Sequence, residues 1–143
     1  MPTSYLRPVF HWRDRQKTLK KLIKKIEKSN LSFDAIAFTG LSGVLIGPFL
    51  AEKLKKEIII CRKKGDSSHC DMRIERNEGE INKYIIVDDL IDVGDTVRRI
   101  VGEIKSDSEK SYDEKISCVG VFLYKDFRQS PIEVDGEEIP VFV

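Results

Sequence analysis

Residues 84–96 read YIIVDDLIDVGDT, and this stretch decides the fold. Its first four residues, Tyr84 to Val87, are typical of a strand buried in a sheet that is covered on both faces. Two adjacent carboxylates, Asp88 and Asp89, follow where the strand leaves the core, and a short turn then leads into a helical pattern. A strand that turns directly into a helix begins a βαβ crossover, which predicts a parallel sheet.

The same alternation recurs on both sides of this stretch. Short apolar runs at 33–38, 57–61 and 116–124 predict further strands. Apolar residues at helical spacing predict helices over about 14–29 and about 47–56. The chain is therefore expected to be an α/β protein, with an open, mostly parallel, twisted sheet flanked by helices.

Three further segments have predicted structures of their own. Residues 97–104 carry a helical apolar face, and the charged residues 103–115 are expected to be a connector that leads to the next strand. Residues 62–82 are polar and lack sustained periodicity, which predicts a flexible loop that covers an active site. The pair Asp135–Gly136, between two short extended runs, predicts a hairpin.

The chain is expected to form a single domain over residues 1–143, with a core over about 30–124. Its longest apolar stretch, around 44–51, contains glycine and proline and is too short to predict a membrane helix. The spacing of its three cysteines fits neither a disulfide framework nor a common zinc site, so we expect a protein of the reducing cytoplasm.

Charge is distributed unevenly along the chain. Residues 1–65 carry a net charge of +10 and residues 66–143 a net charge of −9, which together give the +1 of the whole chain. Much of the positive charge lies on the first predicted helix, in Lys17, Lys20, Lys21, Lys24, Lys25 and Lys28. Such a row is more often a solvated face than a nucleic-acid footprint, so nucleic acid is not expected as a partner.

Two loops leave the carboxyl ends of predicted parallel strands, 39–43 and 88–96, and they should share one site. Because adjacent carboxylates raise one another's pKa, Asp88 and Asp89 should attract a positive group, and a ribose diol or Mg²⁺ would serve. Residues 93–96 present successive backbone N–H groups at a helix N-terminus, which favours a phosphate.

At this point the residues resemble a known family. VDDLIDVGDT (87–96) resembles the phosphoribosyl pyrophosphate (PRPP) signature of type I phosphoribosyltransferases. FTGLSG (38–43) is similar in placement to the pyrophosphate loop of that family, and 62–82 to its flexible flap. The resemblance covers about 33–104. It implies a cytoplasmic, Mg²⁺-dependent transferase of nucleotide salvage that moves the 5-phosphoribosyl group from PRPP to a nucleobase and is a homodimer.

The resemblance also implies roles for individual residues. Asp88 and Asp89 would hold the ribose hydroxyls and, directly or through water, Mg²⁺. Asp92 matches the catalytic carboxylate, which can stabilise the developing ribosyl cation or take a proton from the base. The other implied contacts are the backbone of Leu41, Ser42 and Gly43 for pyrophosphate, Val93, Gly94, Asp95 and Thr96 for the 5-phosphate, and Lys63, Lys64, Ser67, Ser68 and His69 in the flap.

Base recognition is implied by the end of the chain. Lys125 lies where 6-oxopurine enzymes carry a lysine for the exocyclic oxygen, which favours hypoxanthine, guanine or xanthine, although a surface lysine explains the position equally well. Phe142 resembles the stacking ring of those enzymes and Val143 a backbone contact, while a core aromatic is the alternative for Phe142. A small hood, built from 1–15 and 125–143, would cover the base.

Two positions depart from the family pattern. Val93 stands where a small or hydroxylated residue is usual, and Asp95 stands where Gly or Lys is usual. The carboxylate of Asp95 would repel a phosphate unless its side chain points away and caps the following helix. The alternative function is therefore a non-catalytic, regulatory protein of the same fold that binds PRPP or a nucleotide.

Overall fold

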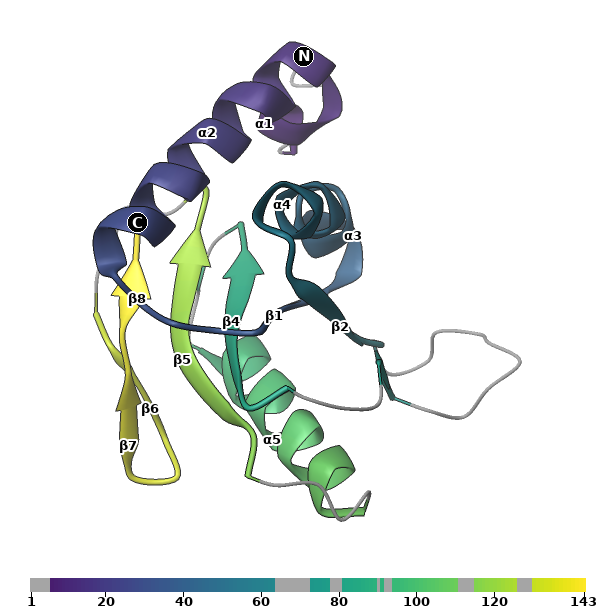
Figure 1. Ribbon diagram of the computed structural model, residues 1–143, viewed down its shortest axis with the longest axis vertical. Helices are drawn as coiled ribbons and strands as arrows, with labels where there is room; N and C mark the ends of the chain where they lie inside the picture. The colour runs from purple at the N-terminus through teal and green to yellow at the C-terminus, as the bar shows by residue number, and fades with distance from the viewer. Residues whose placement is uncertain are drawn as a thin grey trace.

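The computed structural model describes residues 6–63, 73–77, 81–89, 91, 94–110, 115–125 and 130–143. Its helices are α1 (Arg7–Phe10), α2 (Trp12–Ser29), α3 (Gly40–Val44), α4 (Gly47–Leu54) and α5 (Asp95–Lys110). Its strands are β1 (Ala35–Thr39), β2 (Glu57–Cys61), β3 (Ile74–Arg76), β4 (Lys83–Asp88), β5 (Ser117–Leu123), β6 (Ile132–Val134), β7 (Glu137–Ile139) and β8 (Val141–Phe142) (Figure 1).

A six-stranded sheet organises the molecule, in the order β3-β2-β1-β4-β5-β8. Strands β2, β1, β4, β5 and β8 pair in parallel, and β3 is antiparallel to β2. This confirms the predicted open, mostly parallel sheet flanked by helices. Neighbouring strands β1 and β4 form a topological switch point, because the chain leaves β1 toward β2 and leaves β4 toward β5. Ligands of open α/β sheets bind beyond the carboxyl ends of such strands.

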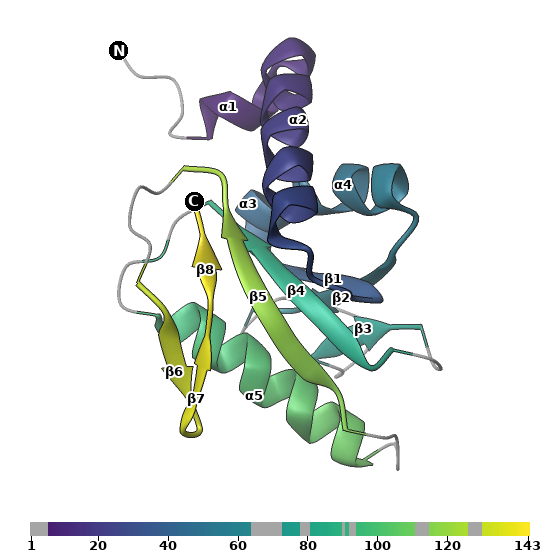
Figure 2. The same ribbon diagram turned by 60° about the vertical axis from the view of Figure 1, so that its left-hand side comes forward.

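Both faces of the sheet are covered by helices. Since side chains alternate along a strand, β1 contributes Ala35 and Ala37 to the core on the α5 side. Its other side chains, Ile36 and Phe38, join the core formed with α1, α2 and α4. Figure 2 shows α2, α3 and α4 on one side of the sheet, with α5 and the β6–β7 hairpin on the other.

Helix α5 is longer than predicted, because residues 103–110 are helical and not a connector. Two features explain the difference. Ser108 continues the buried face of Ile104, and charged residues of α5 pair with β3 and the residue before it. The ion pairs are Arg73–Glu103 and Arg76–Asp107, each at 2.9 Å. Charges that pair across elements carry no periodic signal in the sequence.

The loop predicted over 62–82 contains a strand. β3 pairs with β2 through Cys61 and Ile74, both of which are buried. Ile74 alone is too short an apolar signal to predict a strand. Residues 64–72 and 78–80 lie outside the described residues, so the rest of the predicted flap stays a prediction.

Two of the predicted turns contain positive φ angles. In the predicted hairpin, Asp135 and Gly136 have φ angles of 51° and 81°, and positive values at both positions are what a tight hairpin turn requires. This confirms the hairpin. The loop predicted at 39–43 is instead the last residue of β1 and most of the short helix α3, which begins at Gly40 with a φ of 62°.

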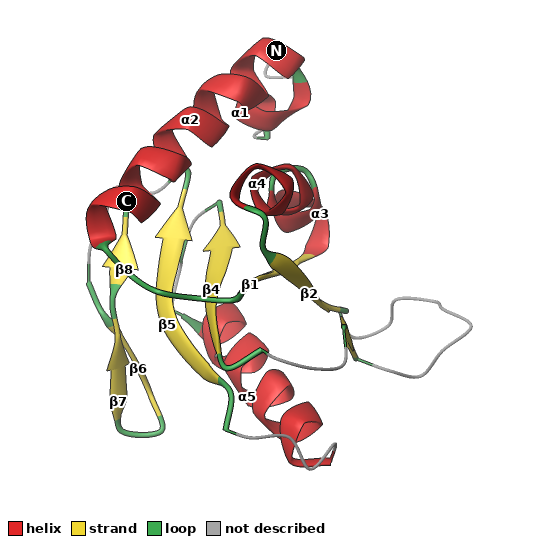
Figure 3. Ribbon diagram, in the orientation of Figure 1, coloured by secondary structure: helices red, strands yellow, loops and turns green. Residues whose placement is uncertain are grey.

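The two segments predicted to form a hood, 1–15 and 125–143, are described in part, and their role as a cover for the base stays a prediction. Figure 3 shows α1 and the first turns of α2 beyond the carboxyl ends of β4 and β5, and the β6–β7 hairpin at the opposite end of the sheet. The hairpin lies there because its residues Ile132 and Ile139 are buried in the core on the α5 side. In the described part of the chain, no helix combines the length and the apolar character needed to cross a membrane.

Candidate functional site

The site is built around the acidic pair at the end of β4. Asp88 and Asp89 are buried, with exposures of 8% and 7%. The two residues that follow β5 hold the backbone of this pair in place, because the amides of Tyr124 and Lys125 donate to the carbonyls of Asp88 and Asp89 at 3.2 and 2.8 Å. The sheet therefore holds two carboxylates side by side at the switch point.

Two donors and burial determine the state of Asp88. The hydroxyl of Ser42 and the amide of Asp89 both donate to Asp88 Oδ1, at 3.0 and 2.9 Å. Burial, with the neighbouring Asp89 carboxyl, raises the pKa of Asp88 to about 7. Within the described ranges, no lysine or arginine forms an ion pair with either carboxylate. An added cation or hydroxyl donor would therefore stabilise the fully ionised pair.

Helix α3 is attached to this pair and to the end of β5. Tyr124 Oη donates to the carbonyl of Ser42 at 2.6 Å, in addition to the bond from Ser42 to Asp88. Helix α3 packs directly on Phe38, since a Cβ added at Gly43 would lie 2.6 Å from the Cβ of Phe38. The first N–H groups of any helix lack intrahelical acceptors, so the start of α3 keeps the donor character expected of a pyrophosphate loop.

The three predicted pyrophosphate contacts on this helix, Leu41, Ser42 and Gly43, differ in exposure and in contact with the acidic pair. The side chain of Leu41 is 70% exposed, Gly43 is buried, and Ser42 is the member that reaches the acidic pair. The structure thus brings the 39–43 and 88–89 segments together, as predicted for a shared site. Contact with pyrophosphate stays a prediction.

A cavity of about 380 Å³ lies beside α3 and the end of β2. Its lining residues are Gly40, Leu41, Val44, Ile60, Cys61, Arg62, Lys63 and Glu75. Lys63 lies over the start of α3, because a Cβ added at Gly40 would be 3.0 Å from the Lys63 Nζ atom. The other flap residues named from the sequence, Lys64, Ser67, Ser68 and His69, lie outside the described residues.

The predicted phosphate turn precedes α5. Gly94 has a φ of 85°, and its carbonyl accepts from the amide of Arg98 at 3.0 Å. The side chain of Asp95 is 84% exposed, and its Oδ1 atom lies 3.5 Å from Arg98 Nη1. Of the two alternatives for Asp95, the structure supports a side chain directed to solvent. Thr96 is exposed at the start of the helix, and Asp92 and Val93 lie outside the described residues.

Arg99 is a site-supporting residue that the sequence interpretation missed. Its guanidinium donates to Thr39 Oγ1 at 3.1 Å and to the carbonyl of Arg62 at 3.2 Å, and it pairs with Glu103 at 3.3 Å. Arg99 therefore joins the ends of β1 and β2 to α5, next to Gly40 and Lys63. The four-residue spacing of Arg99 and Glu103 was visible in the sequence, but it does not indicate which strands an arginine reaches.

The residues predicted to bind the base differ in their burial and in their contacts. Lys125 is half-buried beside Asp89 at the end of β5. Phe142 stacks on Phe122, with ring centroids 4.6 Å apart and an interplanar angle of 12°. One face of Phe142 is thus covered by the core, as the alternative of a core aromatic expected. Val143 follows it and is partly buried, and the base contacts stay predictions.

Asp88 and Asp89 are the candidate ligands of the magnesium ion that the resemblance implies. Among the described residues there is no group of three or more His, Cys, Asp or Glu side chains that could hold a metal ion. Mg²⁺ usually needs only one or two protein carboxylates, because it keeps waters and shares substrate phosphates. Asp88 and Asp89 are buried and form no ion pair with a described lysine or arginine, and they fit that description.

Comparison with known sequences identifies relatives, although no family model matches the chain. The orotate phosphoribosyltransferase of Pyrococcus horikoshii is 30% identical over 109 residues, which are 76% of this chain and 55% of that protein. The chain spans about half the length of the curated relatives it matches, 51% and 55%.

Solved structures of the same class share the architecture. The orotate phosphoribosyltransferase of Aeropyrum pernix superposes with a TM-score of 0.65 at 12% identity, over 84% of this chain and 63% of that one. A solved adenine phosphoribosyltransferase superposes with a TM-score of 0.61 at 23% identity, over 95% of this chain and 83% of that one.

Proposed function

We propose that this chain, which has the type I phosphoribosyltransferase fold, transfers the 5-phosphoribosyl group of PRPP to a nucleobase and releases pyrophosphate. One observation carries the proposal. A buried pair of carboxylates, Asp88 and Asp89, lies at the switch point, is bonded to Ser42, and precedes the glycine turn that begins α5. The two segments of the resemblance that the structure describes therefore lie side by side.

The acidic pair would bind the ribose. Its carboxylates would accept hydrogen bonds from the two ribose hydroxyls, and these donors would stabilise the ionised form of Asp88. Because the pKa of Asp88 is about 7 without substrate, ribose binding below that pH should release a proton. Mg²⁺, if held by the same carboxylates, would neutralise charge on the departing pyrophosphate.

The remaining residues would bind the two phosphate ends and assist bond breaking. Gly94 and Thr96, at the start of α5, would bind the 5-phosphate through backbone N–H groups and a hydroxyl. Lys63 and the first turn of α3 would bind the pyrophosphate. Asp92 would stabilise the ribosyl cation that forms as pyrophosphate leaves, or take the proton of the incoming base.

The choice of base rests on two separate arguments. The curated relatives are named as orotate phosphoribosyltransferases, which makes orotate the first base to test. The position of Lys125 beside Asp89 keeps the 6-oxopurines as the second candidate. The same transfer chemistry serves both, so the base does not affect the assignment of the reaction.

The test incubates the purified protein with PRPP, Mg²⁺ and each of orotate, hypoxanthine, guanine, xanthine, adenine and uracil, and separates nucleotide products by chromatography. We expect one product with wild-type protein. Asp89→Asn and Asp92→Asn should each lower kcat/KM by at least about a hundredfold. Glu138→Gln, which neutralises an exposed carboxylate of β7, is the matched control and should leave the rate unchanged.

A second measurement separates this proposal from its alternative. If the folded protein makes no product with any base but binds PRPP by calorimetry, the regulatory function replaces the enzymatic one. If it makes no product and binds neither PRPP nor a nucleotide, both are wrong. The homodimer implied by the resemblance is likewise a proposal, which sedimentation equilibrium tests.

A further inference from the structure

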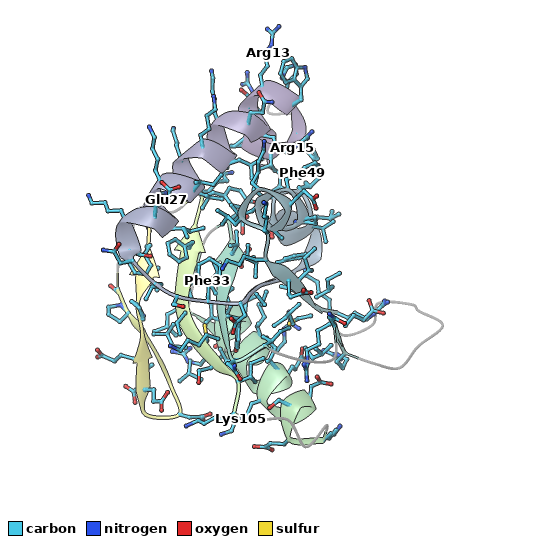
Figure 4. All side chains as sticks on the ribbon, viewed as in Figure 1. Arg13, Arg15, Glu27, Phe33, Phe49 and Lys105 are labelled. Carbon is cyan, nitrogen blue, oxygen red and sulfur yellow. The ribbon has the colours of Figure 1, made fainter. Side chains whose placement is uncertain are left out.

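Helix α2 presents a row of cations to solvent. Its exposed side chains include Arg13, Lys17, Lys20, Lys21, Lys24 and Lys28. At 3.6 residues per turn, the four lysines 17, 21, 24 and 28 fall within roughly 60° of the helix circumference, and the row from residue 13 to 28 is about 22 Å long. Figure 4 shows the side chains of α2 extending away from the sheet between Arg13 and Glu27.

Repulsion among these cations destabilises helix α2. Like charges four residues apart repel one another, and they occur at Arg13–Lys17, Lys17–Lys21, Lys20–Lys24, Lys21–Lys25 and Lys24–Lys28. In the described part of the chain, no carboxylate forms an ion pair with any of them. Among the described residues this repulsion is not compensated, and a polyanionic partner would compensate it.

Exposed aromatic rings lie at the N-terminal end of the row. Phe10 and Trp12 are each 53% exposed. The ring of His11 stacks beside Trp12 at a centroid distance of 6.0 Å, and the Arg13 guanidinium lies 5.1 Å from the Trp12 ring centroid. Exposed aromatic rings next to a cationic row are the arrangement with which proteins bind single strands, because bases stack on rings while phosphates follow the charges.

We propose that α2 and the aromatic step at Phe10 and Trp12 bind single-stranded nucleic acid, with phosphates along the lysine row and bases on the rings. The sequence alone favoured a solvated face. Exposed rings at the end of an unpaired cationic row are the structural observations that change this interpretation. An anionic membrane is the weaker partner, because the apolar face of α2, with Leu19, Leu22 and Ile26, is buried against the rest of the protein.

Fluorescence anisotropy with labelled mixed-sequence RNA and DNA strands of about 16 nucleotides tests the proposal. We expect binding whose affinity falls steeply between about 50 and 200 mM salt. The quadruple variant Lys17→Gln, Lys21→Gln, Lys24→Gln, Lys28→Gln should bind at least about tenfold more weakly. Its log–log salt slope should also be smaller by about 3, since each phosphate contact on a single strand contributes about 0.7.

The matched control removes the same charge elsewhere, with glutamine at the exposed lysines Lys53, Lys83, Lys110 and Lys115. It should keep wild-type affinity, and an equal loss in both quadruple variants would mean that net charge alone acts. Circular dichroism melting curves confirm that each variant is folded. None of these lysines belongs to the proposed catalytic site, so failure here leaves the proposed transferase activity untouched.

Substitution at Trp12 separates base stacking from charge. Trp12→Ala should weaken oligonucleotide binding about tenfold, and Trp12→Phe should restore most of it. Inorganic polyphosphate should compete poorly with the oligonucleotide because it has no bases. The proposal is overturned if Trp12→Ala has no effect and polyphosphate competes equally, or if vesicles with anionic lipid bind while oligonucleotides do not.

Discussion

Asp88 couples the folded state to pH. Its pKa is about 7 in the folded protein and about 4 in an unfolded chain. Between these values the folded state binds more protons than the unfolded state, so stability decreases as pH rises from about 4 to about 7 and the contribution of Asp88 is constant above that. A residue that costs stability at neutral pH is typical of a binding site, where a ligand later compensates the cost.

Asp88→Asn should therefore stabilise the protein at high pH. The amide oxygen of asparagine still accepts from Ser42 and from the Asp89 amide, while the buried charge is removed. We expect the free energy of unfolding in urea to rise by on the order of 2 kcal/mol at pH 8 and by less at pH 5. Asp107→Asn, which weakens the pair with Arg76, is the control and should destabilise; an equal gain for Asp88→Asn at both pH values would contradict the prediction.

Arg99→Gln tests positioning rather than chemistry. The guanidinium holds Thr39 and the carbonyl of Arg62, the residues that precede Gly40 and Lys63. Its loss should raise the KM for PRPP about tenfold, the equivalent of one hydrogen bond to a charged group, with a much smaller change in kcat. Glu103→Gln keeps both bonds and should change KM little. Equal losses in kcat for both variants would mean that Arg99 only supports the fold.

At the residue scale, sequence reasoning works where chemistry is local. Asp88 and Asp89 were identifiable because an apolar strand ends directly before them, so their position at the end of the strand follows from the strand itself. Arg99 was not identifiable, because its bonds reach residues 60 and 37 positions away. The role of Phe142 was ambiguous, because the sequence around it is the same whether its ring stacks on a base or on Phe122.

Elements with their own periodicity were predicted within a few residues, and elements that depend on partners were not. The strands at 57–61 and 84–87 and the helix before 29 follow from apolar spacing. The second half of α5 and strand β3 depend instead on the Arg73–Glu103 and Arg76–Asp107 ion pairs between them. A charged run in the sequence cannot reveal that it pairs with another charged run thirty residues away.

Two glycines offer a matched test of turn and helix. A Cβ has nothing within 4 Å at either Gly136 or Gly102, so the conformation of the backbone decides the outcome. Gly136→Ala places alanine at a φ of 81° and should lower the free energy of unfolding by about 1 kcal/mol. Gly102→Ala, in helix α5, should raise it by about 0.5–1 kcal/mol. Thermal or urea denaturation measures both, and a gain at Gly136 would rule out the left-handed turn.

The whole molecule should not open as one unit. Strands β1 and β4 lie in the middle of the six-stranded sheet between two core layers, whereas β6 and β7 form a separate two-stranded sheet. We expect amides of β1 and β4 to exchange hydrogen only through global unfolding, and those of the hairpin through local opening at much lower free energy. Hydrogen exchange with mass spectrometry measures this, and equal protection of the two regions would contradict it.

The arrangement of the sheet was predictable because crossover connections leave few choices. The position of the β6–β7 hairpin was not predictable. It depends on where Ile132 and Ile139 are buried, which is in the core on the α5 side. Placement of that kind results from long-range packing, which local patterns do not record.

The hydrogen bond from Tyr124 to Ser42 also determines when the site can form. The two residues are 82 positions apart, and Asp88 lies between them in the chain. During synthesis on the ribosome, Ser42 and Asp88 emerge before Tyr124, which follows β5. A nascent chain stopped before residue 124 would hold residues 39–43 and 88–89 without the tyrosine that donates to Ser42, so this contact forms only after residue 124 has been synthesised.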